Sequence, residues 1–121
     1  MRICIPTDTA NGISSIVFGH FGSAPFFTIY DDCEDLFVIV KNANKHHEHG
    51  SCNPISILNE MKINTVICRG MGARALQNLN NGGIRAFVSN ASTVKDAIEA
   101  YENNSLMEMT LQDSCQDHGC H

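Results

Sequence analysis

The sequence lacks three features that would each place it in a broad class of protein. It has no run of basic residues and a formal net charge of −5, so the clustered Lys and Arg that bind nucleic-acid phosphates are missing. No apolar stretch approaches the ~20 residues that span a membrane. The start, MRICIPTD, follows a strand pattern and has no signal-peptide layout. We therefore expect a cytoplasmic protein that binds neither nucleic acid nor membrane.

Common catalytic arrangements are missing as well. The sequence contains no G-x-S-x-G nucleophile motif and no H-E-x-x-H metalloprotease motif. Asp8 and Glu60 are the nearest approach to a nuclease acid pair, but no third carboxylate accompanies them. We expect a protein that is not an enzyme.

What is present fits one globular domain. The chain has 121 residues, of which 43% are hydrophobic and 17% charged, enough for a core without disulfide staples. Strand patterns and helix patterns occur in a definite order. We expect strands at 2–7, 26–31, 36–42, 65–68 and 84–89, and helices from Asn53-Pro54, at 73–79, and after a Ser92 or Thr93 cap.

This order predicts an α/β fold. Three strands form an antiparallel meander, with a hairpin between the second and third, and α-β-α-β-α follows. The result is a mixed five-stranded sheet with helices on its faces, to which residues 106–111 could add a short edge strand. We assign residues 1–107 to the domain and residues 108–121 to a Cys/His-containing tail.

The six cysteines divide into two groups. Cys4 and Cys68 lie inside apolar strand patterns, where a free thiol behaves as a small hydrophobe, and we expect both in the core. Cys33 lies in the turn DDCED. The other three cysteines stand beside histidines, and in a reducing compartment this favours metal binding over disulfides.

Two short stretches concentrate these Cys and His residues. Thiolate and imidazole ligands together suit zinc, iron or copper. Cys52 also precedes a predicted helix, whose amino end lowers a thiol pKa. A polar surface loop and a frayed terminus remain the alternatives. The candidate metal ligands are His46, His47, His49 and Cys52 in HHEHGSC, and Cys115, His118, Cys120 and His121 in CQDHGCH.

Two further stretches are candidates for binding. His20 lies in FGHFGSA, where glycines permit unusual backbone and close approach of a ligand, although a lone histidine is often structural. CRGMGAR follows a strand and opens a helix, so its amides with Arg69 or Arg74 could hold an anion around Gly70 and Gly72. It lacks the third glycine of a dinucleotide fingerprint and the Lys of a P-loop. Simple turn chemistry is the alternative.

Three segments in this order carry a family resemblance: FGHFGSAPFFTIYD, TVICRGMGARALQNLNNGGIRAFV and TVKDAIEAYENNSL. Residues 1–107 resemble the dinitrogenase iron–molybdenum cofactor biosynthesis family, which includes NifX-type carriers and the C-terminal domain of NifB-type proteins. The resemblance implies a ribonuclease-H-like fold and a non-enzymatic role in binding or carrying iron–sulfur-type cofactor precursors. It implies that His20 matches the family's histidine, and Gly70 and Gly72 its glycine-rich turn. The His/Cys loop and tail are not core family features.

These observations lead to one expected function with two alternatives. We expect a carrier for an iron–sulfur or iron–molybdenum type cluster or its precursor, with cofactor-assembly or acceptor proteins as partners. The first alternative is a chaperone or buffer for zinc, copper or nickel ions that uses the loop and tail. The second is a regulatory or adaptor module that needs no metal.

Overall fold

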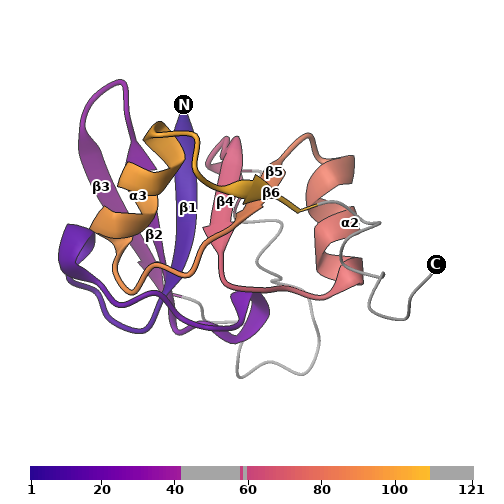
Figure 1. Ribbon diagram of the computed structural model, residues 1–121, viewed down its shortest axis with the longest axis horizontal. Helices are drawn as coiled ribbons and strands as arrows, with labels where there is room; N and C mark the ends of the chain where they lie inside the picture. The colour runs from indigo at the N-terminus through magenta and orange to yellow at the C-terminus, as the bar shows by residue number, and fades with distance from the viewer. Residues whose placement is uncertain (42–57, 59, 110–121) are drawn as a thin grey trace.

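The protein is built on one mixed sheet (Figure 1). A computed structural model describes residues 1–41, 58 and 60–109. The strands lie in the order β3-β2-β1-β4-β5-β6. The β1–β4 and β4–β5 pairs are parallel, and the other three pairs are antiparallel. The strands are β1 (Arg2–Thr7), β2 (Phe26–Asp31), β3 (Leu36–Lys41), β4 (Thr65–Cys68), β5 (Arg85–Val88) and β6 (Met107–Glu108).

A tight turn between β2 and β3 fixes the meander. The Asp31 carboxylate accepts hydrogen bonds from the backbone N–H groups of Cys33 (3.0 Å) and Glu34 (3.4 Å), so this side chain closes the turn. Asp35 has a φ of 55°, which Asp tolerates better than most residues. Arg2 Nε donates to the same Asp31 carboxylate at 3.2 Å and holds its pKa below the usual range. The turn is therefore tied to the start of β1.

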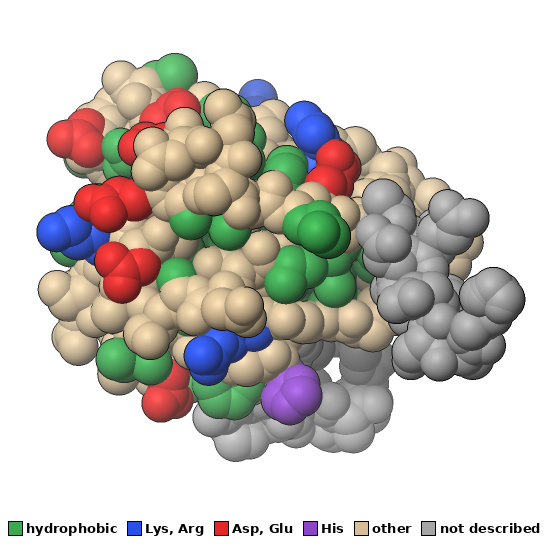
Figure 2. Space-filling model, viewed as in Figure 1, with side chains coloured by type: hydrophobic (Ala, Val, Ile, Leu, Met, Phe, Trp, Pro, Cys, Tyr) green, Lys and Arg blue, Asp and Glu red, His purple; other side chains and the backbone are tan. Residues whose placement is uncertain are grey.

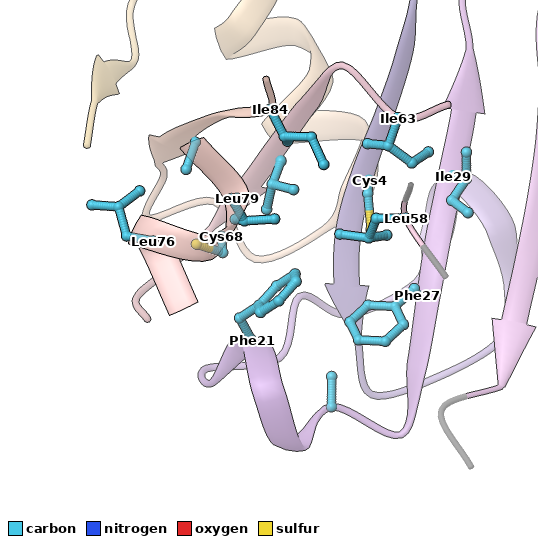
Figure 3. Close-up of a cluster of buried hydrophobic side chains, with 13 residues drawn as sticks. Cys4, Phe21, Phe27, Ile29, Leu58, Ile63, Cys68, Leu76, Leu79 and Ile84 are labelled. Carbon is cyan, nitrogen blue, oxygen red and sulfur yellow. The ribbon is translucent and has the colours of Figure 1, made fainter. Parts of the chain in front are cut away.

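Two α-helices and two short 3-10 helices have both ends within the described residues, and the two faces of the sheet carry separate cores. Alternate residues of β1 and β4 point to opposite faces, as strand geometry requires. Cys4, Val66 and Cys68 pack with α2, whereas Ile3, Ile5 and Ile67 pack with α3 (Figure 3 shows the first cluster). The helices are α2 (Ala73–Asn81), α3 (Val94–Glu102), η1 (Gly12–Ser14) and η2 (Phe21–Ser23).

Most of the predicted order is confirmed. The meander, its hairpin, the buried cysteines and the helices at 73 and 94 are where the sequence places them. The sheet has six strands among the described residues rather than five, because the short edge strand expected within 106–111 is present: β6 pairs antiparallel with β5 over two residues. The first predicted helix lies mainly outside the described residues, where only Leu58 and Glu60 are seen, both helical. The ribonuclease-H-like description stays a prediction.

Among the described residues, no helix has both the length and the apolar character needed to cross a membrane.

Candidate functional site

His20 stands on an exposed loop whose position is set by the aromatic residue beside it. Phe21 is buried and packs on Phe27 of β2, with ring centroids 5.4 Å apart. His20 itself is extended (φ −126°, ψ 123°) and precedes η2. Figure 2 shows the histidine side chain, in purple, standing out from the surface. Burial of Phe21 therefore anchors the loop, while the His20 side chain is exposed.

The turn after β4 lies directly beside this loop. The Phe21 N–H donates to the Gly70 carbonyl at 3.4 Å, and a Cβ added at Gly70 would come within 4.0 Å of the Gly19 carbonyl oxygen. The φ angle is not positive at Gly19, Gly70 or Gly72. The unusual backbone expected around His20 is therefore not found at Gly19. A Cβ at Gly19 or Gly72 would meet nothing within 4 Å. These glycines leave open surface rather than a strained backbone.

The amino end of α2 forms the other side of the turn. Its N-cap is Gly72, no side chain caps it, and its first turn contains no acidic residue. The first amides of a helix have no partner inside the helix, and the helix dipole makes this end favourable for an anion. Arg69 and Arg74 are exposed on either side, and among the described residues neither forms an ion pair. The turn is electropositive and open.

The thiol beneath the turn is not available as a ligand. Cys68 ends β4 with no exposed surface, and burial raises the pKa of its thiol to about 12, although a hydrogen bond from the Gly70 N–H acts in the opposite direction. Burial likewise raises the pKa of Cys4, and the nearby Cys68 adds to the effect. Both thiols keep their protons near neutral pH. The expectation that they are core residues is confirmed.

The sheet topology explains why the loop and the turn meet. β1 and β4 are adjacent and parallel, so the segments that follow them leave from the same edge of the sheet. The first continues to β2 on one side, and the second continues through α2 to β5 on the other. Ligands of open α/β sheets bind at such a point, where connections diverge beyond the carboxyl ends of strands. Local sequence patterns identify both segments, but their proximity follows only from the parallel pairing of β1 with β4.

The predicted metal ligands belong to the His/Cys loop and the tail. Residues 46–52 and 115–121 lie outside the described residues, so their grouping stays a prediction. Lys41, the last described residue before the first stretch, lies at the same end of the sheet, because it pairs with Phe26, and Phe26 pairs with Thr7 at the end of β1.

One cluster of possible ligand atoms, which no sequence motif indicates, lies at the opposite end of the strands. Ligand atoms of Asp31, Asp32 and Cys33 come within 4.8 Å of one another. The amino group of Met1 lies 2.9 Å from the Asp32 carboxylate and 3.5 Å from the Cys33 sulfur. Because Asp31 closes the hairpin turn and binds Arg2, turn structure accounts for this cluster.

Two surface hollows also lie away from His20. One of about 300 Å³ is lined by Arg85, Phe87, Tyr101, Glu102, Asn104 and Leu106, and one of about 200 Å³ adjoins Tyr30, Phe37 and Ile98. In the larger hollow, Arg85 is engaged: it binds both carboxylate oxygens of Glu108, at 2.8 and 3.1 Å.

A match to a known protein family shows which family the chain belongs to. The family described as dinitrogenase iron-molybdenum cofactor matches residues 1–104. The chain belongs to this family. The match includes His20 and the Arg69–Arg74 turn, and the resemblance read from the sequence is confirmed. No curated protein matches the chain.

The chain is also similar to solved structures. The chain is similar to a candidate NifB protein from Thermotoga, with 28% identity and a TM-score of 0.76 over 88% of this chain and 91% of that one. It is similar in fold to the apo form of the orange protein from Desulfovibrio gigas (22% identity, TM-score 0.82, 90% and 92% covered). It is also similar in fold to a candidate dinitrogenase from Methanocaldococcus jannaschii (17%, 0.69, 91% and 95%).

Proposed function

We propose that the protein binds an anionic iron–sulfur or iron–molybdenum type cluster, or its precursor, at the carboxyl ends of β1 and β4. It releases this cargo to an acceptor protein of cofactor assembly and catalyses no reaction. The observation that carries the proposal is the hydrogen bond from Phe21 to Gly70, which joins the His20 loop to the uncapped turn of α2. Membership of the iron–molybdenum cofactor family supports the identity of the cargo.

The described residues fit such a cargo. A protein can stabilise an anionic cluster by offsetting its charge and by donating hydrogen bonds to its sulfur atoms. Free backbone amides and guanidinium groups can do both. The first amides of α2 donate toward an anion at Gly72, and Arg69 and Arg74 offset its charge. His20 supplies an exposed imidazole, a ligand suited to iron.

The incomplete ligand set agrees with a carrier role. His20 is the one histidine at this edge among the described residues, and the thiols of Cys4 and Cys68 are buried. A cluster held by one imidazole and by electrostatic contacts exchanges its ligands more readily than one held by four thiolates. We propose that Cys52, Cys115 and Cys120, with the neighbouring histidines, contribute the remaining ligands during loading and release.

The arginines provide a first test. Tetrathiomolybdate, a metal–sulfur dianion, is a suitable probe, because its visible absorption reports binding without a need to build a cluster. Replacing Arg69 or Arg74 by Gln removes one exposed charge near the anion, so we expect affinity to fall roughly two- to five-fold for each variant. The difference from wild type should shrink as salt is raised, since exposed charges are screened. The measurement is an anaerobic titration followed by absorption.

Lys95→Gln is the matched control for this titration. Lys95 is an exposed cation on α3, on the opposite face of the sheet, and its loss changes the net charge equally. Equal weakening in all three variants would show a general charge effect and contradict the proposed location.

The alternatives receive less support. The family description names iron and molybdenum, which does not favour a chaperone for zinc, copper or nickel. The metal-independent adaptor leaves the uncapped helix end and its flanking arginines without a role. Stoichiometric metal after anaerobic loading separates the proposed carrier from the adaptor.

A further inference from the structure

β3 is an apolar edge strand without the usual protection. Among the described residues, three of the seven exposed large hydrophobics lie in this one strand: Leu36 is 51% exposed, Val38 43% and Ile39 38%. The strand contains no Pro or Gly, and its pairing with β2 runs unbroken from Leu36 to Lys41, without a bulge. Lys41, at the last position, is its one charged residue.

The other edge of the same sheet is protected. β6 contains only two residues, Met107 and Glu108, and its Glu108 is bound to Arg85. Natural proteins shorten, charge or bend an edge strand to prevent it from pairing with another chain. β3 has six residues, and no strand of the described chain pairs with its outer side (Figure 1). This difference between the edges points to a partner for β3.

We propose that β3 pairs antiparallel with β3 of a second copy of this chain, about a two-fold axis at Val38. Continuation of a sheet requires paired residues to lie on the same face, because a one-residue slip reverses every side chain. With Val38 opposite itself, Leu36 lies opposite Val40 and Phe37 opposite Ile39. The same register brings Asp35 of each copy opposite Lys41 of the other.

Charge complementarity selects this register and this partner. A centre at Ile39 would place Lys41 opposite Phe37, and a centre at Phe37 would place it opposite Cys33. Only the Val38 centre joins Asp35 to Lys41, and the two-fold axis repeats the pair at both ends. The Tyr30 hydroxyl donates to the Asp35 carboxylate at 3.2 Å, so this carboxylate lies on the face of the sheet that Tyr30 shares with its paired residue Phe37. Lys41 is four residues beyond Phe37 in β3, and strand alternation places its side chain on the same face. The strand is therefore complementary to itself.

The interface is short, so the dimer is weak and reversible. We expect a dissociation constant of roughly 10–100 µM, at the low end of specific interfaces. The experiment is sedimentation equilibrium of the full chain in reducing buffer, which prevents cross-linking through exposed thiols such as Cys33. We expect a monomer–dimer equilibrium for the wild type. Concentration-dependent amide shifts in ¹⁵N spectra should be confined to residues 35–41.

Two variants test the register. Val38→Lys puts two like charges opposite each other on the axis, and we expect association to fall at least ~10-fold. Lys41→Asp, at an exposed strand end, should also weaken it. Asp35→Lys places Lys at a φ of 55° and removes the hydrogen bond from Tyr30, so Asp35→Lys alone is the matched variant for this cost. The double variant Asp35→Lys with Lys41→Asp restores opposite charges and should associate more tightly than either single variant. Far-UV circular dichroism confirms that each variant is folded.

Met107→Lys is the control, because it adds the same charge to an exposed apolar residue of the other edge strand. It should leave the equilibrium unchanged. A wild type that stays monomeric to about 500 µM overturns the proposal, as does a dimer that Val38→Lys does not weaken. A double variant that associates no more tightly than either single variant overturns the register. This inference does not depend on the proposed cargo, since none of these measurements uses metal.

Discussion

At the residue scale, the described cysteines differ in chemistry because they differ in burial. Cys4 and Cys68 lie inside the core, and burial raises the pKa of each thiol. Cys33 is exposed in the hairpin turn. A buried thiol stays neutral because the low dielectric of the core disfavours its thiolate. The cysteines of the β-sheet are therefore inert near neutral pH, and any thiolate ligand must come from elsewhere in the chain.

The raised pKa of Cys68 predicts a loss of stability in alkali. The native thiol keeps its proton up to about pH 12, whereas the unfolded thiol ionises near its ordinary value of 9.0. Stability is thus fully present below pH 9 and declines as the pH rises toward 12, by up to roughly 1.4 kcal/mol per pH unit for one thiol. Cys68→Ala should flatten the decline in the free energy of unfolding between pH 9 and about 10.5, measured with urea.

Val66→Ala is the control for this series, since it removes core volume from the same strand and cluster as Cys68 without removing a titratable group. Its pH dependence should run parallel to that of the wild type. Parallel curves for Cys68→Ala as well would show that burial of Cys68 does not control the alkaline transition.

At the scale of elements, helix α3 depends on one side-chain cap. The Asp96 N–H donates to Thr93 Oγ1 at 3.3 Å, while the Ser92 carbonyl accepts from Val17 through the backbone alone. Thr93→Ala should lower the free energy of unfolding by about 1 kcal/mol, as loss of an N-cap does. Ser92→Ala should leave it within a few tenths. The free energies of unfolding of both variants are measured with urea. Equal decreases in the two variants would mean that Thr93 is not the cap of α3.

The cap also shows what the sequence could predict about elements. Apolar spacing placed α3, but Ser92 and Thr93 are both good caps, so only the hydrogen bond distinguishes them. The first strand and the hairpin were predicted to within a residue, because alternation and turn residues are local signals. The two-residue β6 was expected only as an addition to five strands, since it forms by pairing with β5, a contact distant in sequence.

At the scale of the whole molecule, the proposed binding site and the proposed dimer interface lie on different parts of the sheet. The His20 loop and the α2 turn lie at the carboxyl ends of β1 and β4, while β3 is the outer strand beyond β2. Acidic side chains gather on the face shown in Figure 2 over α3, away from this turn. A chain of net charge −5 thus presents its uncapped helix end and two arginines where we propose an anion binds.

The site could be predicted only in part. The sequence identifies His20 and the Arg69–Arg74 turn, because a histidine between glycines and a turn that opens a helix are local patterns. It does not show that the Phe21 N–H donates a hydrogen bond to the Gly70 carbonyl. This contact follows from the parallel pairing of β1 with β4. Nor does the sequence show that the glycines have ordinary backbone angles. Pairing over more than sixty residues is decided by packing of the whole sheet.

The most direct test of the proposed function is anaerobic loading with ferrous iron, sulfide and molybdate, followed by elemental analysis and ¹⁵N spectra of the loaded protein. We predict stoichiometric metal with matching sulfide, and paramagnetic broadening centred on residues 19–21 and 69–75. Amides near Arg85 and Tyr101, at the larger hollow, should stay sharp. Protein that emerges without metal, or broadening centred on that hollow, would contradict the account.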